Sequence, residues 1–284
     1  MSNSTFSHPL AEQSAVIIDA ANNTIAASLL ELWQRRELLY FLVARDLKVR
    51  YRQTAMGFLW ALLQPLFTMG MFNVVFGRLG NMPSDGLPYP LFCLAGIVPW
   101  MFFQSAVSQA ANSLVNNSSL LSKIYLPRLA LPLSAVGATL VDLMISLAML
   151  LAMLVYYRLP LRVEMLCLPL FLLLCAMAAA GVGVWLATIN VRYRDVRYIL
   201  PFILQIWMFA SPIAYPATLI PDTYRYLYSL NPLVVIVSGV RWSLLGTPSV
   251  PVPQTGVAIV ITVVLLITGI MYFVYKERDF ADVL

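Results

Sequence analysis

Charged residues are scarce in this chain. Only 11% of its 284 residues are Asp, Glu, Lys or Arg, whereas soluble domains carry about 25%. Residues 86–122 contain no charged residue, and residues 129–157 contain only Asp142. Uncharged runs longer than about 18 residues are typical of membrane-spanning helices. The composition therefore excludes an ordinary soluble domain and predicts an integral membrane protein.

Histidine and cysteine are also rare. His8 is the one histidine, and it lies in a polar N-terminal stretch. Cys93, Cys167 and Cys175 lie in apolar runs, at a spacing that matches neither a metal site nor a disulfide framework. The chain has no G-x-x-x-x-G-K-[ST] sequence to cradle phosphates. We therefore expect no metal, no cofactor and no catalytic site on this chain.

Acidic residues are almost absent from the predicted spans. Asp142 is the one exception, while proton- or sodium-coupled carriers usually hold more ionisable groups inside the membrane. Asp142 is either a lone coupling site or a side chain that is hydrogen-bonded inside the helix bundle. The second interpretation is favoured, and it implies that another polypeptide supplies the energy.

The apolar runs predict an all-α integral membrane fold with six transmembrane helices. Those helices are expected at residues 56–76, 91–111, 129–157, 165–191, 198–210 (the start of the fifth) and 257–275. Four prolines break residues 211–246, which predicts short re-entrant helices at the outer face between spans five and six. The small residues at 178–183 predict a close helix–helix contact.

The N-terminal 53 residues differ from the rest. Residues 1–27 are polar and predict a flexible cytoplasmic leader, and residues 54–284 form the transmembrane domain. Residues 28–53 contain six basic residues with apolar residues at three- and four-residue steps. This pattern predicts an amphipathic helix at the membrane interface, with a capping box formed by Ser28 and Glu31. The alternative is a soluble helix that binds a partner.

The basic residues predict the orientation of the chain. With both termini in the cytoplasm, 13 of the 18 Lys and Arg residues lie on the cytoplasmic side and five lie outside. Loops rich in Lys and Arg stay on the cytoplasmic side of a membrane. We therefore predict cytoplasmic N and C termini.

The loop between the second and third predicted spans has an unusual pattern. Residues 116–132 read NNSSLLSKIYLPRLALP, so Lys123 and Arg128 lie between two very apolar regions. Clustered Asn and Ser, a short apolar turn and then Pro127 suit a short surface helix after which the backbone returns to the bilayer. We interpret this segment as a lever that a soluble partner moves.

Five segments in this order resemble the membrane-spanning subunit of ABC-2 type exporters of lipid-linked polysaccharides. They are ARDLKVRYRQTAMGFLWALLQPL at 44–66, the lever at 116–132, NVRYRDVRYIL at 190–200, SPIAYP at 211–216 with SLNPL at 229–233 and then Arg241, and ERDFADVL at 277–284. The resemblance covers roughly residues 30–284. It implies a subunit that moves O antigen, capsule or teichoic acid type glycans across the bacterial inner membrane.

The resemblance also implies partners. A homodimer of this chain would bind two copies of an ATP-binding subunit, which carries the ATP and Mg, and the lever would be the coupling helix that contacts it. The coupling-helix residues would be Asn116, Asn117, Leu120, Lys123, Tyr125 and Arg128. The loop facing the ATPase would contain Arg192, Arg194, Asp195 and Arg197.

Aromatic side chains predict a path for the glycan, because sugar C–H faces pack on aromatic rings. The candidates are Trp60, Phe67, Phe72, Trp100, Phe103, Trp207, Phe209 and Tyr215. Trp and Tyr at membrane interfaces and Phe in helix packing are the ordinary alternatives. Arg50 and Arg52 are candidate contacts for a lipid headgroup, although basic clusters beside a span also bind anionic lipids or fix topology.

Two other functions remain open. One is export of a small lipid or a drug by the same kind of transporter. The other is a membrane enzyme acting on lipid-linked sugars, which would require paired carboxylates or a histidine near the membrane surface. The single histidine and the scattered acids make the enzyme the weaker alternative.

Overall fold

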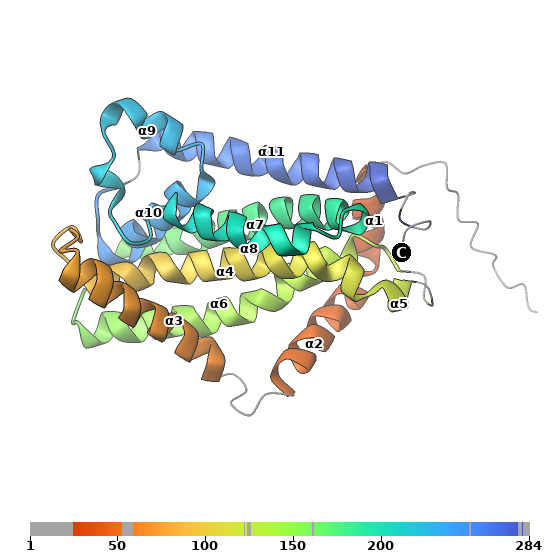
Figure 1. Cartoon of the computed structure of the whole chain (residues 1–284), viewed down its shortest axis with the longest axis horizontal. Coiled ribbons are helices and arrows are strands. Elements are labelled where there is room, and N and C mark those ends of the chain that lie inside the picture. The colour runs from red at the N-terminus through yellow and green to blue at the C-terminus, as the bar shows by residue number, and fades with distance from the viewer. Residues whose placement is uncertain are drawn as a thin grey trace, which may run out of the picture.

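The computed structural model describes residues 25–52, 59–121, 123, 126–160, 162–249, 251–277 and 280. These residues form helices and no strand. The long helices lie side by side along the horizontal axis of Figure 1. They are α4 (Tyr89–Asn116), α6 (Ala130–Tyr156), α7 (Leu168–Arg192), which follows the 3₁₀ helix η2 (Val163–Cys167), and α11 (Val252–Lys276). The predicted all-α membrane fold is confirmed.

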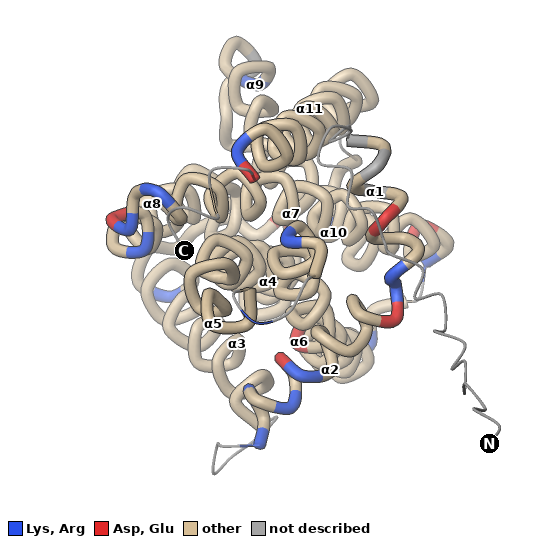
Figure 2. The backbone as a smooth tube through the Cα atoms, turned by 90° about the vertical axis from the view of Figure 1, so that its right-hand side faces the viewer, with Lys and Arg blue, Asp and Glu red and all other residues tan. Residues whose placement is uncertain are grey.

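The two ends of this bundle are occupied by different short elements. The end that we call the α5 end holds α5 (Ser118–Leu121), α1 (Ile25–Gln34) and the end of α11 (Figure 1). We call the opposite end the α9 end. It holds α9 (Asp222–Tyr228) and the π-helix η1 (Asn73–Leu79), which directly continues α3 (Leu59–Phe72). Figure 2, viewed from the α5 end, shows Lys and Arg in α2, near the start of α8 and at the end of α11.

Helix α4 is the centre of the bundle. It contacts α3, α6, α7, α8 (Val196–Phe209) and α10 (Pro232–Leu245). Most side chains of residues 91–103 are buried. A helix that is apolar on all sides is stable only when other helices surround it. The lack of any charge in residues 86–122 thus explains why this helix is innermost.

Glycines let α7 and α11 approach closely. A Cβ atom on Gly181 would lie 2.8 Å from the backbone nitrogen of Leu266, and one on Gly269 would lie 2.7 Å from the carbonyl oxygen of Gly181. On another face of α7, a Cβ on Gly183 would lie 2.6 Å from that of Ala110 in α4. The predicted close contact of residues 178–183 is confirmed, because only glycine fits where two backbones meet.

We expect Gly269→Ala to lower the free energy of unfolding by about 1–3 kcal/mol. The obstructing atom is backbone, so α7 and α11 must separate to admit the methyl group. Gly256→Ala on the same helix is the matched control, because a Cβ there has nothing within 4 Å, and it should be neutral or slightly stabilising. Thermal unfolding of both purified variants in detergent checks this. Equal Tm values would contradict the close contact.

The N-terminal helix is divided at Arg35 into α1 and α2 (Arg36–Arg52). Since α1 packs on α11 and α2 packs on α6, the two halves follow different neighbours. The prediction of one helix over residues 28–53 is therefore wrong. Trp33, Tyr40 and Phe41 are 65–77% exposed. Exposed aromatic residues on a basic helix are typical of a membrane surface, so the interface location stays a prediction.

The predicted capping box is also wrong. Because α1 already begins at Ile25, Ser28 lies inside the helix. Glu31 pairs instead with Arg35, with 3.4 Å between Oε1 and Nη2. Residues 1–24 of the predicted leader lie outside the described residues, and residues 25–27 belong to the first turn of α1.

The proline-rich region consists of short helices, as predicted. The 3₁₀ helix η3 (Ala217–Leu219), α9 and α10 follow α8. Helix α10 begins where the Asn231 side chain accepts a hydrogen bond from the Leu233 N–H at 3.1 Å. It ends at Gly246, whose φ of 70° requires glycine.

By length and hydropathy, five helices of the described residues can cross a membrane. They begin at Leu59, Tyr89, Ala130, Val163 and Val252. Helix α8 lies where the fifth span is predicted, but its 14 residues extend about 21 Å. This length is less than a hydrocarbon core of ~30 Å. The described residues thus contain five of the six predicted spans, and a crossing by α8 stays a prediction.

Candidate functional site

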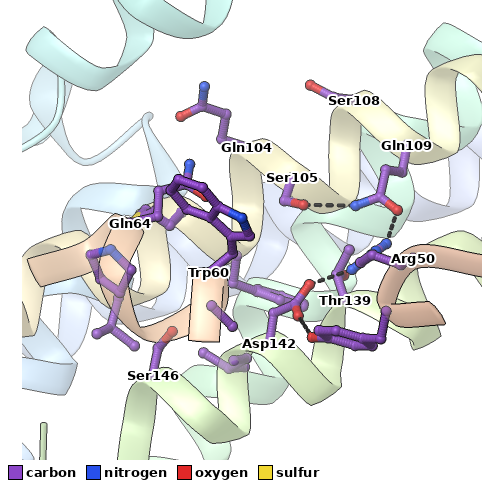
Figure 3. Close-up of a pocket in the computed structure, with 17 residues that line it drawn as sticks. Arg50, Trp60, Gln64, Gln104, Ser105, Ser108, Gln109, Thr139, Asp142 and Ser146 are labelled. Atoms are coloured by element: carbon purple, nitrogen blue, oxygen red, sulfur yellow. Dashed lines mark hydrogen bonds and ion pairs between the residues drawn. The ribbon is translucent and has the colours of Figure 1, made fainter. Parts of the chain in front are cut away.

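A polar cavity of about 380 Å³ lies between α2, α3, α4 and α6. We call it the α2–α6 cavity. Figure 3 shows side chains from α4 and from α6 on two sides of it, with Trp60 between them. Its polar lining consists of Arg50, Tyr51, Gln64, Gln104, Ser105, Ser108, Gln109, Thr139, Asp142 and Ser146. Polar side chains thus gather, together with apolar ones, beside two long apolar helices, where such groups need hydrogen-bond partners.

An ion pair closes one side of this cavity (Figure 3). The Arg50 guanidinium donates to Asp142 and to the side-chain oxygen of Gln109, and the Tyr51 hydroxyl donates to Asp142. Gln109 in turn donates to the Ser105 hydroxyl at 2.7 Å. The interpretation of Asp142 as hydrogen-bonded inside the bundle is confirmed. Arg52 is exposed and does not line the cavity.

The opposite side of the cavity has polar groups without partners. Gln64 and Gln104 are exposed, and their amides make no hydrogen bond within the described part of the chain. Trp60 is 51% exposed and lines the cavity between them. These groups are therefore available to a ligand.

The described part of the predicted lever contains one short helix. Helix α4 continues to Asn116, and α5 follows it with four residues; Ser122 and Ile124 lie outside the described residues. Asn116 and Lys123 are exposed at the end of the bundle, whereas Leu120 is half-buried against the apolar cluster beneath it. Leu120 thus attaches the lever to the bundle, and Asn116 and Lys123 face solvent. Tyr125 lies outside the described residues.

Two side chains tie the lever to other helices. Arg45 of α2 donates to the Asn117 side-chain oxygen at 2.9 Å. Arg128 donates to the carbonyl of Glu277, at the end of α11. Burial raises the pKa of the Glu277 carboxyl, and the charge of Arg128 opposes that rise. The lever is therefore connected by side-chain hydrogen bonds to α2 and to the end of α11.

The second predicted cytoplasmic loop is exposed at the same end. Arg192, Arg194, Asp195 and Arg197 all face solvent, and the loop reduces to residues 193–195 between α7 and α8. Arg197 lies over the Tyr198 ring, 4.9 Å from its centroid. The α5 end therefore presents the lever and this charged turn together (Figure 2).

The predicted aromatic path is divided by the structure. Trp60 and Phe67 are exposed on α3, and Phe209 is exposed on α8. Phe72, also on α3, is half-buried and stacks near Phe76, with 5.2 Å between ring centroids. These four side chains lie at or near the surface of the protomer.

The other four predicted aromatics face inward. Trp100 and Phe103 are 2% and 0% exposed in the core, so within one protomer they pack helices rather than line a path. Trp207 is half-buried and donates to Asn231 at 3.0 Å. Tyr215 is also half-buried and donates to the Phe209 carbonyl at 3.1 Å.

Comparison with known proteins identifies the family. Residues 37–245 match the sequence profile of the family described as ABC-2 type transporter. The chain belongs to the ABC-2 type transporter family. It is 30% identical over 257 residues to the O-antigen export system permease protein RfbA of Myxococcus xanthus, which covers 89% of this chain and 97% of that protein.

Two further relatives have related names. The chain is 23% identical over 249 residues to the O-antigen export system permease protein RfbA of Klebsiella pneumoniae, covering 87% of this chain and 95% of the relative. It is 25% identical over 199 residues to the polysialic acid transport protein KpsM of Escherichia coli, covering 69% of this chain and 76% of the relative. As an ABC-2 type transporter, the chain is a multi-pass inner-membrane transport subunit that works with a separate ATP-binding subunit; it is not an enzyme.

The role of one residue of this ABC-2 subunit was not predicted. Arg241 is 2% exposed, and its guanidinium donates to the carbonyls of Phe92 at 3.1 Å, Pro212 at 2.5 Å, Ile213 at 2.6 Å and Tyr215 at 3.3 Å. It thus holds the irregular backbone after α8 against α4. The signal in the sequence is a lone arginine inside an otherwise apolar helix.

The polar stripe of α4 was also missed. Gln104, Ser105, Ser108 and Gln109 recur at spacings that place them on one face of a helix. Attention to charge alone overlooked them, because amides and hydroxyls do not interrupt a hydropathy window. In this ABC-2 transporter they are all of the polar residues that α4 contributes to the lining of the cavity.

Proposed function

We propose that this chain is the membrane-spanning subunit of an ATP-driven exporter that moves lipid-linked polysaccharide across the bacterial cytoplasmic membrane. The observation that carries the proposal is the match, over 89% of the chain and 97% of the relative, to a permease named for O-antigen export. The relative named for polysialic acid transport supports the same substrate class. The cargo is a glycan of the O-antigen, capsule or teichoic acid type.

ATP hydrolysis belongs to the partner in this proposal. The chain contains no phosphate-cradling loop of the G-x-x-x-x-G-K-[ST] type, so ATP and Mg bind on a separate subunit. The α5 end offers that subunit an exposed polar surface made of Asn116, Lys123 and the turn at residues 193–195. We assign this surface to the ATPase contact, with the lever as the coupling helix.

The charge distribution supports a cytoplasmic α5 end. The lever, the start of α2, the end of α7 and the end of α11 lie there (Figures 1 and 2). Lys and Arg collect on the cytoplasmic side of bacterial membrane proteins. Both termini are then cytoplasmic, and the short helices η3 and α9 face outward.

A second copy of the chain completes the path in this proposal. Only 6% of the most apolar window of residues 59–79 is buried in the protomer, and α8 leaves Phe202, Ile206 and Phe209 more than half exposed. Together with Trp60 and Phe67, these faces offer apolar and aromatic surface that one protomer does not cover. We assign the glycan path to a dimer bounded by α3 and α8.

Deletion of the gene tests the proposal. Cells without this chain should lose their surface polysaccharide and accumulate lipid-linked glycan on the cytoplasmic side, and the intact gene should restore export. Labelling of surface glycan, together with mass spectrometry of extracted lipid-linked glycan, measures both effects. Normal surface glycan combined with a new sensitivity to a drug or a lipid would contradict polysaccharide export and favour a small amphiphile as the cargo.

A further inference from the structure

The ion pair of the α2–α6 cavity lies deep in the bundle. Asp142 is 12 residues from the first residue of α6 and Gln109 is 7 residues from the end of α4, which places them about 18 Å and about 10 Å along those helices from the α5 end. Arg50 and Asp142 are the charged residues in the lining. Ionisable side chains at such depth are costly and mark functional sites.

The pair neutralises a charge that would otherwise be costly. Asp142 supplies the carboxylate that pairs with Arg50. The Arg50 side chain is 25% exposed and the Asp142 side chain is 27% exposed. An unpaired cation there would carry a large desolvation penalty. The pair is nevertheless accessible from the cavity, so an incoming anion can compete with Asp142 for the guanidinium.

The remaining lining has the chemistry of a sugar site. The free amides of Gln64 and Gln104 and the Ser108 and Ser146 hydroxyls supply donors and acceptors for sugar hydroxyls. The exposed ring of Trp60 supplies a flat apolar surface for C–H groups. A volume of about 380 Å³ is within the range of small-molecule sites.

We propose that the α2–α6 cavity binds the first sugar of a lipid-linked glycan together with its adjoining phosphate, and that the phosphate replaces Asp142 as the partner of Arg50. This inference rests on the proposed function, since it takes its ligand from a lipid-linked glycan. The sugar contacts Trp60 and the amides of Gln64 and Gln104. The phosphate contacts Arg50 at the side of the cavity that faces α2.

The exchange is favourable because of the geometry of the two groups. A guanidinium forms paired hydrogen bonds with phosphate as well as with carboxylate. A diphosphate carries more negative charge than Asp142 and brings its own oxygens to replace those lost. The carboxylate that is set free keeps its hydrogen bond from Tyr51. Asp142 thus holds Arg50 in place in the absence of ligand, and the phosphate displaces Asp142 from Arg50 when the ligand binds.

Binding by the purified full-length chain in lipid nanodiscs tests the site. Three probes separate its parts: a prenyl diphosphate–glucose conjugate, prenyl diphosphate without sugar, and octyl glucoside. The conjugate should bind more tightly than either of the others, because it alone fills both halves of the cavity. Isothermal titration measures the three affinities, and size-exclusion chromatography confirms that each variant is folded.

Four variants should each give a different pattern of the three affinities if the proposal is right. Arg50→Gln should weaken both diphosphate probes about 10- to 100-fold and leave octyl glucoside unchanged. Asp142→Asn should strengthen them, because Arg50 then lacks a competing anion. Gln104→Ala should weaken the conjugate but not prenyl diphosphate. Lys48→Gln, which removes an exposed charge of the same helix outside the cavity, is the matched control and should change nothing.

The gain in Asp142→Asn is the decisive result, since general damage to the fold only weakens binding. Equal affinities of the wild type, Arg50→Gln and Asp142→Asn for the diphosphate probes would overturn the proposal. If cells carrying Arg50→Gln or Gln104→Ala export glycan normally while binding is lost, this site is wrong and the proposed function stands. Loss of glycan export in the gene deletion is the separate measurement on which that function depends.

Discussion

Arg241→Ala is expected to lower the free energy of unfolding by about 3–5 kcal/mol, because each hydrogen bond to a charged group contributes about 1.5–3 kcal/mol. The substitution leaves the carbonyls of Phe92, Pro212 and Ile213 without their donor in a buried place. It also leaves a space beside Gly96, where a Cβ would lie 2.7 Å from the Arg241 guanidinium. Proteins retain only about 5–15 kcal/mol in total, so most molecules should fail to accumulate.

Immunoblotting of membranes and thermal unfolding in detergent measure this loss. Arg241→Lys should recover only part of the stability, because a single ammonium does not reach carbonyls on both α4 and the segment at residues 212–215. Arg78→Ala removes an exposed arginine near the same end and is the control. If Arg241→Ala and Arg78→Ala give the same Tm, Arg241 does not hold this segment in place.

Lys123→Glu is expected to reduce glycan export at least about tenfold, the effect of losing roughly 1.4 kcal/mol of a charge-dependent contact. The side chain is exposed on the lever, so the folded protein should accumulate normally. The ATPase should still hydrolyse ATP, because its nucleotide site is on the other subunit. Hydrolysis without transport is the sign of a broken coupling contact.

Surface labelling of the glycan measures export, and phosphate release by the purified complex measures ATP hydrolysis. Arg78→Glu makes the same charge change on an exposed residue of η1, away from the α5 end, and should export normally. If Lys123→Glu exports as well as Arg78→Glu, the lever does not contact the ATPase through this residue. If ATP hydrolysis falls in parallel with export, Lys123 is required for assembly rather than for coupling.

Most helix positions were predictable because hydropathy is a property of consecutive residues. The third span, predicted at 129–157, is α6 at Ala130–Tyr156, and the fourth, at 165–191, matches η2 and α7. The second was predicted to end near residue 111 but continues to Asn116. Ser113 and Leu114 are 5% and 0% exposed, so this part of α4 still packs against other helices and the helix continues.

The division of the N-terminal helix and its buried side were not predictable in the same way. The apolar spacing over residues 28–53 is continuous, and nothing in it marks Arg35 as a break. The break arises because α1 and α2 contact different helices, α11 and α6. Leu42 is 2% exposed because α2 packs on α6.

The sequence by itself determined that this chain crosses a membrane several times, which segments do so, and where its positive charges collect. Those properties depend on the transfer of each segment from water to lipid, which is additive along the chain. Only the tertiary structure decided that Arg50 meets Asp142, that Arg241 binds the carbonyls after α8, and that Trp100 and Phe103 are buried. Such contacts join residues far apart in sequence, and hydropathy carries no information about which helix faces come together.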